Sequence, residues 1–263
     1  MDLRLKDLTA LVTGSSRGLG FAVARLLAAE GARVAINGRN QAPLETARQQ
    51  LAAETGADVF SLAADLTQPD APQQLVDQTV AALGGLDILV TNAGGPPAGA
   101  FENLDENQWD LAIQLSLMSH VRLIRAALPH LKRSSAASVL SVASYSVKQP
   151  IPMLVLSNSV RAATVGLSKS LALELGSLGI RFNAILPGWT NTERVTELMK
   201  ARAEANHTSV QEEIDKQIVN SALGRMATPD EFANAAVFLV SPAASYITGA
   251  VLSVDGGMYK GTF

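Results

Sequence analysis

Short hydrophobic runs alternate along the chain with longer segments whose hydrophobic positions follow a helical period. The short runs predict strands and the longer segments predict helices with one buried face. The predicted strands are Ala10–Thr13, Arg33–Ile36, Asp58–Leu62, Asp87–Val90, Ala137–Val142, Arg181–Ile185 and Val251–Val254. The predicted helices span residues 18–30, 42–55, 70–83, 106–132, 157–177, 195–220 and 229–240.

The predicted strands are nearly continuous hydrophobic runs, which is typical of strands covered on both faces of a parallel sheet. Their alternation with helices predicts right-handed βαβ units wound onto both sides of one sheet. We therefore expect one α/β domain over residues 1–263, a doubly wound and mainly parallel seven-stranded sheet flanked by helices. The polar segment at about 190–220 interrupts this alternation. We expect a substrate lid there rather than a plain surface helix, because ligands bind at the carboxyl edge of such sheets.

Composition and charge narrow the class of protein. Hydrophobic residues make up 48% and charged residues 17% of the chain, which is typical of a globular protein. The net charge is −3 with both signs interspersed, which predicts no nucleic-acid partner and no polybasic membrane patch. The absence of cysteine excludes disulfides and thiol catalysis and favours a reducing compartment, the cytoplasm. We expect no signal peptide, and no membrane span, because no hydrophobic run approaches about 18 residues.

A glycine-rich turn lies between the first predicted strand and the first predicted helix. In the stretch TGSSRGLG, Gly14 permits a tight turn, Gly18 lets the backbone approach a pyrophosphate, and Gly20 allows close packing of helix and strand. The N–H groups at the start of the helix then face the phosphates. The spacing alone is a weak signal, but its place between strand and helix predicts a Rossmann-type dinucleotide site.

The end of the second predicted strand indicates which dinucleotide binds. The stretch VAINGRN offers no acidic side chain to accept hydrogen bonds from the ribose 2′-hydroxyl of NAD. Arg39 follows that strand, and Arg17 lies in the glycine-rich turn. Either arginine alone is equally well explained as a solvated surface charge, but two guanidiniums suit a 2′-phosphate. The pattern predicts NADP(H) as the cofactor.

Five motifs occur in the order and at the intervals of one known family. They are TGSSRGLG at 13–20, DL at 65–66, NAG at 92–94, PGWTNT at 187–192 and a closing stretch, from GRMATPDEF to SVDGG, at 224–257. Over its whole length the chain resembles a short-chain dehydrogenase/reductase, in the style of the 3-oxoacyl-carrier-protein reductases.

The resemblance implies which residues hold the cofactor. They are Gly14, Ser16, Arg17, Gly18, Leu19, Gly20, Arg39, Asp65, Leu66, Asn92, Ala93, Gly94, Pro187, Gly188 and Thr192. Among them, Asp65 and Leu66 would flank the adenine, and the stretch from 187 to 192 would border the nicotinamide. The resemblance also implies a homotetramer or a dimer, packed through the predicted helices 106–132 and 157–177.

The acid–base residues usual in this family are largely replaced here. The family uses an asparagine, a serine, a tyrosine and a lysine, with the serine thirteen residues before the tyrosine. That register keeps the serine as Ser144, puts Ser157 in the place of the tyrosine and, four residues on, Arg161 in the place of the lysine. Counting seven residues from Trp109 puts Ser116 in the place of the asparagine. These three serines and Arg161 are the candidate catalytic residues.

The replacements leave the source of a proton open. A serine hydroxyl is a far weaker acid than a phenol, and an arginine does not give up its proton. Tyr145 is followed by Lys148, but this spacing is one residue short, and neighbours on extended chain face opposite ways. We therefore expect Tyr145 to turn away from Ser144, which makes it a less favoured acid. Water, Tyr145 and a group of the substrate all stay open as sources of the proton. We expect His120 to be a packed helix histidine, and no group of side chains has the spacing of a metal site.

Three functions stay open on the sequence. The favoured one is an NADP(H)-dependent oxidoreductase that acts on a small carbonyl or alcohol, because the nucleotide-binding residues are intact. The second is a dinucleotide-binding protein without normal redox turnover, such as a sensor or a partner-binding module. The third is a non-redox isomerase or lyase that uses the same polarised pocket.

Overall fold

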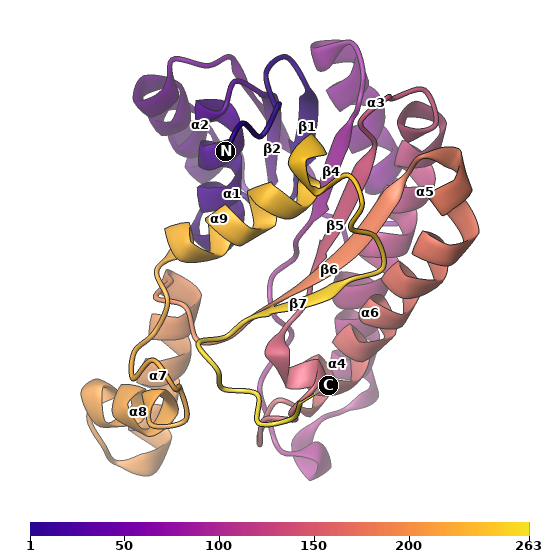
Figure 1. Ribbon diagram of the computed structural model, residues 1–263. Coiled ribbons are helices and arrows are strands. Elements are labelled where there is room, and N and C mark those ends of the chain that lie inside the picture. Colours follow the sequence, from indigo (N-terminus) through magenta and orange to yellow (C-terminus); the bar gives the residue numbers. More distant parts are fainter. Residues whose placement is uncertain (263) are drawn as a thin grey trace.

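A seven-stranded parallel sheet forms the centre of the computed structural model, which describes residues 1–262 (Figure 1). The strand order is β3-β2-β1-β4-β5-β6-β7, and every neighbouring pair is parallel. The strands are β1 Thr9–Val12, β2 Arg33–Gly38, β3 Val59–Ala63, β4 Ile88–Thr91, β5 Ser138–Val142, β6 Arg181–Pro187 and β7 Val251–Val254. The predicted fold class and all seven predicted strands are confirmed.

Helices cover both faces of the sheet. One hydrophobic core joins α1, α2 and α9 to the sheet, and a second joins α3, α5 and α6 to its other face. Short 3-10 turns also occur, among them η3 at Tyr145–Val147. The helices are α1 Gly18–Ala29, α2 Gln41–Thr55, α3 Ala71–Leu83, α4 Glu106–Ile113, α5 Ser119–Leu131, α6 Val155–Leu175, α7 Glu193–Asn206, α8 Val210–Ile218 and α9 Pro229–Val240.

Two segments predicted as single helices are divided in the structure. The segment 195–220 forms α7 and α8, because His207 adopts the left-handed conformation with φ +54° and Ser209 starts a new helix with a capping box. The segment 106–132 forms α4 and α5 around a π-helical turn at Gln114–Met118. Hydrophobic periodicity continues through both breaks, so the pattern did not reveal them.

The helical segment Glu106–Leu131 contains an 18-residue stretch with a mean hydropathy of 1.2, so by length and composition alone it could cross a membrane. Polar side chains such as His120, Arg122 and Arg125 interrupt it, so it holds no uninterrupted hydrophobic run of the length that the sequence analysis considered. The segment supplies Leu123, Ile124 and Leu131 to the core beneath the sheet. Its hydrophobic side chains are thus used in packing, as in the core helix of a folded domain.

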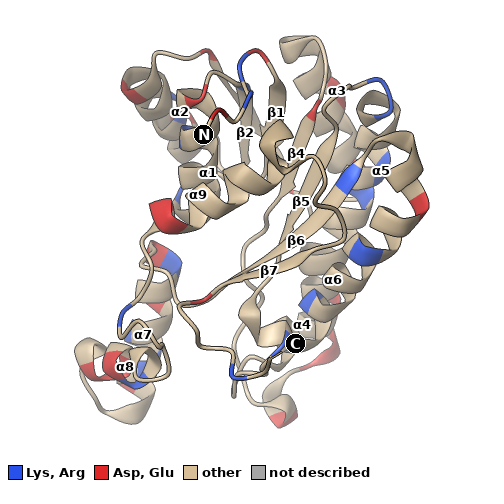
Figure 2. Ribbon diagram, viewed as in Figure 1, with Lys and Arg blue, Asp and Glu red and all other residues tan. Residues whose placement is uncertain are grey.

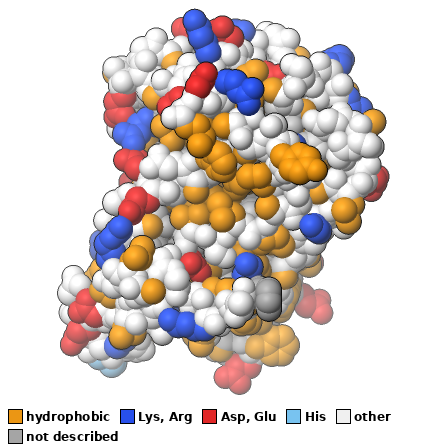
Figure 3. Space-filling model, viewed as in Figure 1, with side chains coloured by type: hydrophobic (Ala, Val, Ile, Leu, Met, Phe, Trp, Pro, Cys, Tyr) orange, Lys and Arg blue, Asp and Glu red, His pale blue; other side chains and the backbone are white. Residues whose placement is uncertain are grey.

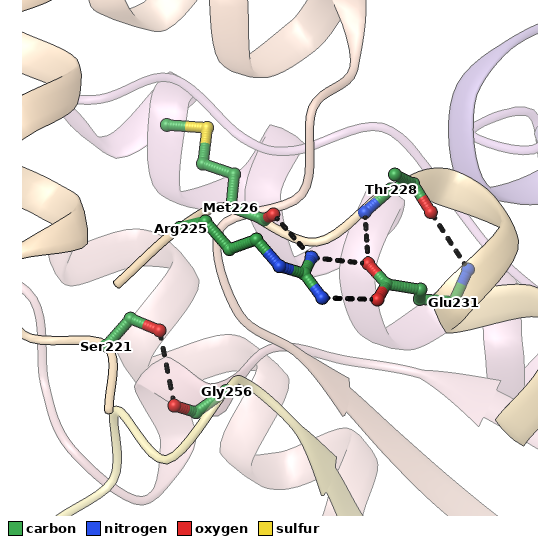
Figure 4. Close-up of polar contacts among 6 residues, drawn as sticks. All are labelled: Ser221, Arg225, Met226, Thr228, Glu231 and Gly256. Atoms are coloured by element: carbon green, nitrogen blue, oxygen red, sulfur yellow. Dashed lines mark hydrogen bonds and ion pairs between the residues drawn. The ribbon is translucent and has the colours of Figure 1, made fainter. Parts of the chain in front are cut away.

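The two helices α7 and α8 leave the body of the molecule after β6 and return to it before α9 (Figure 1). Acidic and basic residues are interspersed along this pair of helices (Figure 2). The return is fixed by Arg225, whose guanidinium forms a fork with both carboxylate oxygens of Glu231 at 2.6 and 2.8 Å (Figure 4). Glu231 also completes the capping box with Thr228 at the start of α9. This geometry explains the sequence GRMATPDEF at that point.

Candidate functional site

A cleft of about 310 Å³ lies where β1, β4, β5 and β6 end at one edge of the sheet. Carboxyl ends of neighbouring parallel strands meet at such an edge, which is where ligands bind in open α/β sheets. Most of the residues predicted to form a site line this cleft: Gly14, Arg17, Gly18, Leu19, Asn92, Ala93, Gly94, Ser144, Ser157, Arg161, Pro187, Gly188 and Thr192. Ser16, Gly20, Arg39, Asp65, Leu66 and Ser116 lie outside its wall.

The glycine-rich turn leaves room that a side chain would fill. Gly14 and Gly18 adopt φ +56° and φ +63°, the left-handed region that favours glycine. A Cβ atom at Gly20 would lie 2.4 Å from the carbonyl oxygen of Gly14. No side chain caps α1, so the N–H groups of its first turn stay available. This cradle fits the phosphates of a dinucleotide.

Asn92 ties the end of β4 to the glycine-rich turn. Its amide donates a hydrogen bond of 3.0 Å to the carbonyl oxygen of Gly14. Its backbone carbonyl accepts a hydrogen bond of 2.8 Å from the hydroxyl of Thr13, and its backbone N–H donates one of 2.9 Å to the same hydroxyl. Asn92 therefore shapes the cradle, and its side-chain amide is already used.

The end of β2 presents a neutral and basic surface. The amide of Asn37 is buried and donates to the backbone carbonyls of Leu62 and Ala64, so it faces β3. Ser16 packs beside Gly38, where a Cβ atom would lie 3.3 Å from the serine Oγ. Arg39 follows directly and is exposed. Ser16 and Arg39 thus lie close together at the end of β2. In proteins that bind NAD, an acidic side chain at this position would bind the ribose.

Arg17 lies on the cleft wall but is paired with α7. Its Nη1 is 2.5 Å from a carboxylate oxygen of Glu193 and 3.3 Å from one of Glu197. The hydrogen bond that Arg17 donates to Glu193 is the main cause that raises the pKa of Arg17. This arginine joins the glycine-rich turn to the start of α7, rather than lying free beside Arg39.

Asp65 and Leu66 follow β3, next to the end of β2. The carboxylate of Asp65 accepts hydrogen bonds from the backbone N–H and the hydroxyl of Thr67 at 3.1 and 2.9 Å. Leu66 is buried in the core under α3. Both lie beyond the cleft wall, on the side of the sheet where the resemblance puts an adenine.

Arg161 is buried at the floor of the cleft and holds three backbone carbonyls. Its Nη1 donates to Val142 at 3.2 Å and to Ala143 at 3.0 Å, and its Nη2 donates to Gly94 at 3.4 Å. The guanidinium thus ties the end of β5 to the loop after β4. Burial first, and the charge of Arg194 second, lower the pKa of Arg161 to about 10, so it stays protonated at neutral pH.

Ser144 and Ser157 present two hydroxyl groups to the same cleft. Ser144 lies two residues after β5, and its Oγ accepts a hydrogen bond of 3.2 Å from the N–H of Ser146, so its own proton stays available to a ligand. Ser157 lies in the first turn of α6. The side-chain amide of the next residue, Asn158, donates a hydrogen bond of 2.9 Å to the backbone carbonyl of Ile151. This bond holds the loop that precedes α6 against the helix turn that carries Ser157.

Ser116 lies behind the cleft, 1% exposed, in the π-helical turn. Its backbone carbonyl accepts a hydrogen bond from the hydroxyl of Thr164 on α6, while its own Oγ is buried without a partner among the described residues. One turn on, the imidazole of His120 is 2.7 Å from the hydroxyl of Thr91. Burial lowers the pKa of His120 to about 3, so it is a neutral, packed histidine as expected.

Tyr145 lines the cleft beside Ser144, contrary to the expectation that it turns away. The chain is not extended there, because Ser144 caps the 3-10 turn η3, which starts at Tyr145. The ring packs with Leu186 and Trp189. Burial raises the pKa of the phenol, and a hydrogen bond from Trp189 acts in the opposite direction. The phenol of Tyr145 is therefore a neutral part of the cleft wall at physiological pH.

Two further cleft residues, Trp189 and Arg194, are not among the predicted site residues, although Trp189 lies within the PGWTNT motif. Trp189 follows β6, and the guanidinium of Arg202 on α7 lies 5.4 Å from its ring centroid. Arg194, in the first turn of α7, donates a hydrogen bond of 3.3 Å to the backbone carbonyl of Pro96. Only the juxtaposition of α7 and the loop after β4 brings Arg194 to the site. Among the residues that the structure describes, no group of acidic and histidine side chains has the geometry of a metal site.

Comparisons with known proteins show the family of this chain. The family described as "Enoyl-(Acyl carrier protein) reductase" matches residues 14–259. The chain is 32% identical, over 99% of both lengths, to the uncharacterized oxidoreductase YvrD of Bacillus subtilis. It is 34% identical to a 3-oxoacyl-acyl-carrier-protein reductase of Chlamydia muridarum, over 98% of this chain and 100% of that protein.

A solved structure has nearly the same fold. It is the L-sorbose reductase of Gluconobacter frateurii complexed with NADPH and L-sorbose, which superposes with a TM-score of 0.94 and 31% sequence identity. The match covers 99% of this chain and 100% of that one. With a family match along almost the whole length and the glycine cradle at the end of β1, the chain belongs to the short-chain dehydrogenase/reductase family of oxidoreductases.

Proposed function

We propose that this protein is an NADP(H)-dependent oxidoreductase that interconverts a small carbonyl compound and its alcohol. One observation carries the proposal: the uncapped first turn of α1, the two serine hydroxyls and Arg161 all line one cleft. A dinucleotide laid along the glycine cradle would end beside those hydroxyls. The reductases among the relatives support this reading.

The end of β2 supports NADP(H) rather than NAD(H). A 2′-phosphate there would meet the hydroxyl of Ser16 and the guanidinium of Arg39, and the end of β2 itself carries no acidic side chain. The side-chain amide of Asn37 does not face the ribose, because it donates hydrogen bonds to backbone carbonyls of β3 and of the residue that follows it. The L-sorbose reductase of Gluconobacter frateurii, which is complexed with NADPH, is consistent with the same choice.

The residues of this chain would orient and polarise the substrate. NADPH, when bound, supplies a hydride to the carbonyl carbon. Ser144 and Ser157 donate hydrogen bonds to the carbonyl oxygen, and Arg161 keeps the ends of β4 and β5 at a fixed separation beneath it. Serine is too weak an acid to release its own proton, so the proton of the alcohol comes from water that enters the cleft.

A second candidate is a dinucleotide-binding protein without redox turnover. Arg161 favours it, because this side chain uses three donors on backbone carbonyls. Tyr145 favours it as well, because burial raises the pKa of the phenol on the cleft wall. A cleft that binds the cofactor without an efficient acid would serve as a sensor.

The remaining parts of the molecule would serve this activity. The helices α7 and α8 would form a lid over a cleft in a single domain of residues 1–263, since α7 supplies Glu193 and Arg194 to the wall. Hydrophobic side chains gather on the face over β7 and α9 (Figure 3), and Leu173 on α6 is 78% exposed. These faces would pack in a homo-oligomer, a tetramer or a dimer.

The first test is a fluorescence titration with NADPH, followed by small ketones, aldehydes and 3-oxoacyl thioesters in the same cuvette. We expect saturable binding and oxidation of NADPH with at least one class of carbonyl. Binding without oxidation across the whole panel would favour the sensor. No binding of NADPH or NADH would contradict both candidates.

Replacing Arg39 by alanine tests the choice of cofactor. We expect NADPH binding to weaken roughly 10- to 100-fold while NADH binding changes little, because the charge-assisted hydrogen bonds to the 2′-phosphate are lost. The dissociation constants of both cofactors measure this. Arg133→Ala is the control, because it removes an exposed arginine at the far end of α5. Equal affinities of the unmodified protein for NADPH and NADH would refute the assignment.

A further inference from the structure

Two arginine side chains line the cleft without a carboxylate partner. Among residues 1–262, neither Arg161 nor Arg194 forms an ion pair. The only acidic side chain on the described wall is Glu193, and Glu193 is already paired with Arg17. The wall therefore carries two positive charges in excess. Arg161 is buried, whereas Arg194 is exposed. Buried charges in proteins are ordinarily paired, so the unpaired charge of Arg161 points to a ligand.

Both guanidiniums meet at the same loop. Arg161 donates to the carbonyl oxygen of Gly94, and Arg194 donates to that of Pro96, two residues further along. Between them, a Cβ atom at Gly95 would lie 3.5 Å from Nη2 of Arg194, and one at Gly94 would meet nothing within 4 Å. Glycine at these positions leaves space next to both charges.

Arg161 keeps hydrogen-bonding capacity for an anion. Its Nη1 uses both protons on Val142 and Ala143, and its Nη2 uses one on Gly94. The Nε proton and the second Nη2 proton have no acceptor among the described residues. These two nitrogens share one edge of the planar guanidinium, and a carboxylate pairs with such an edge through both oxygens.

The two positive charges also oppose one another. Burial is the first cause that lowers the pKa of Arg161, and the charge of Arg194 is the second. Arg194 is held by one backbone carbonyl only, so its position allows it to close over a ligand from the start of α7. An anion between the two side chains would turn this repulsion into attraction.

We propose that this part of the cleft binds the carboxylate of the substrate, which makes the substrate an oxo acid or a hydroxy acid rather than a neutral ketone or alcohol. The carboxylate lies between Arg161 and Arg194, and the carbonyl faces Ser144 and Ser157. The hydrophobic wall of Ile151, Leu154 and Trp189 accommodates a short carbon chain. This inference rests on the proposed function and names its substrate class.

The phosphates of the cofactor are the competing anions. They have a separate cradle in the uncapped turn of α1, where Gly18 faces Thr192 and a Cβ atom would lie 3.7 Å from the threonine methyl. Arg161 and Arg194 instead contact the loop at 94–96. Measuring substrate binding to protein already saturated with NADP⁺ separates these two sources of negative charge.

The experiment compares acetoacetate with methyl acetoacetate, which has the same ketone but no carboxylate. Binding is measured by calorimetry on the free protein and on the protein saturated with NADP⁺, and reduction is measured with NADPH. We expect acetoacetate to bind roughly 10- to 100-fold more tightly than its ester, with NADP⁺ present or absent. We expect the same preference in kcat/KM.

Three variants locate the effect. Arg194→Gln should remove most of the preference by weakening acetoacetate alone, and Arg194→Lys should restore part of it. Lys200→Gln is the matched control, because it removes a positive charge from an exposed position on the same helix and does not line the cleft. Arg161→Gln should remove the preference too, and its folding is checked by circular dichroism, since this side chain holds three carbonyls.

The outcomes separate this inference from the proposed function. Equal binding of acid and ester to a protein that oxidises NADPH would overturn the inference and leave the function standing. Displacement of acetoacetate by NADP⁺ would show that the two arginines serve the cofactor, and would also overturn it. A protein that binds no NADPH would refute the function, and the calorimetric comparison on the free protein would then decide the inference alone.

Discussion

The two halves of the cleft differ in which atoms form them, backbone atoms in one half and side-chain atoms in the other. In the half next to α1, backbone atoms form the wall: glycines leave space, and the N–H groups of the first turn are not capped by a side chain. In the half below α7, side chains form it: two serine hydroxyls and two guanidiniums. The first half depends on room that no side chain can fill. The second depends on donors that several residue types supply, so its chemistry can differ while the fold stays the same.

The largest effect is expected where the backbone half is filled. In Gly20→Ala, the new Cβ atom would lie 2.4 Å from the carbonyl oxygen of Gly14, so α1 must move away from β1. Overpacking of this kind costs about 3 kcal/mol of folding free energy. Because the displaced α1 no longer presents its first turn to the phosphates, we also expect NADPH affinity to fall roughly 100-fold. Fluorescence titration measures this, and circular dichroism shows whether the fold survives.

Gly166→Ala is the matched control for that change. Gly166 lies exposed in α6, and a Cβ atom there would meet nothing within 4 Å. Alanine should stabilise the helix by about 0.5–1 kcal/mol and leave NADPH affinity unchanged. If both alanine variants bind NADPH equally well, the close packing at Gly20 is not what shapes the cradle.

In the half formed by side chains, substitutions should leave the fold intact and change the enzymatic activity. The double variant Ser157→Tyr with Arg161→Lys installs the pair usual in the family, with a phenol whose pKa a nearby ammonium lowers. We expect the turnover number for methyl acetoacetate to rise roughly 100-fold, the lower end of what a general acid contributes. Steady-state kinetics with NADPH measures this.

The single variant Arg161→Lys is the control for the double one. It keeps the charge but cannot hold Val142, Ala143 and Gly94 together, so we expect turnover to fall. A loss of activity in the double variant as well would mean that Ser157 and Arg161 have a chemical role of their own, which the usual pair does not replace.

The smallest effect is expected outside both halves, at the fork that anchors α9. Hydrogen bonds from Arg225 and from the backbone of Thr228 lower the pKa of Glu231 from 4.5 to about 2. Because the pKa is lowered in the folded protein, the stabilisation is complete above pH 4.5 and is lost as the pH falls through 2. Glu231→Gln should therefore lower the melting temperature slightly at pH 7 and leave it unchanged near pH 2.

Thermal unfolding followed by circular dichroism across this pH range measures that difference. At pH 7 the NADPH affinity of Glu231→Gln should equal that of the unmodified protein, because neither Arg225 nor Glu231 lines the cleft. A change in NADPH binding in Glu231→Gln would mean that the return from α8 to α9 positions the cleft, and would weaken the comparison between its two halves.

The sequence by itself determined the parallel sheet, its seven strands, the glycine cradle and the family. These features depend on local requirements: strands buried on both faces need hydrophobic runs, and a tight turn next to a phosphate needs glycine. The register with Ser144 likewise put Ser157 and Arg161 in the site, because four residues are about one turn of one helix.

Only the tertiary structure decided how the side chains are used. It brought Arg194 from α7 to the loop after β4, turned Tyr145 toward the cleft through a 3-10 turn, and paired Arg17 with Glu193. It also buried Ser116 in a π-helical turn behind the cleft. Each of these depends on contacts between segments far apart in the chain or on a local break in helical geometry, and hydrophobic periodicity is insensitive to both.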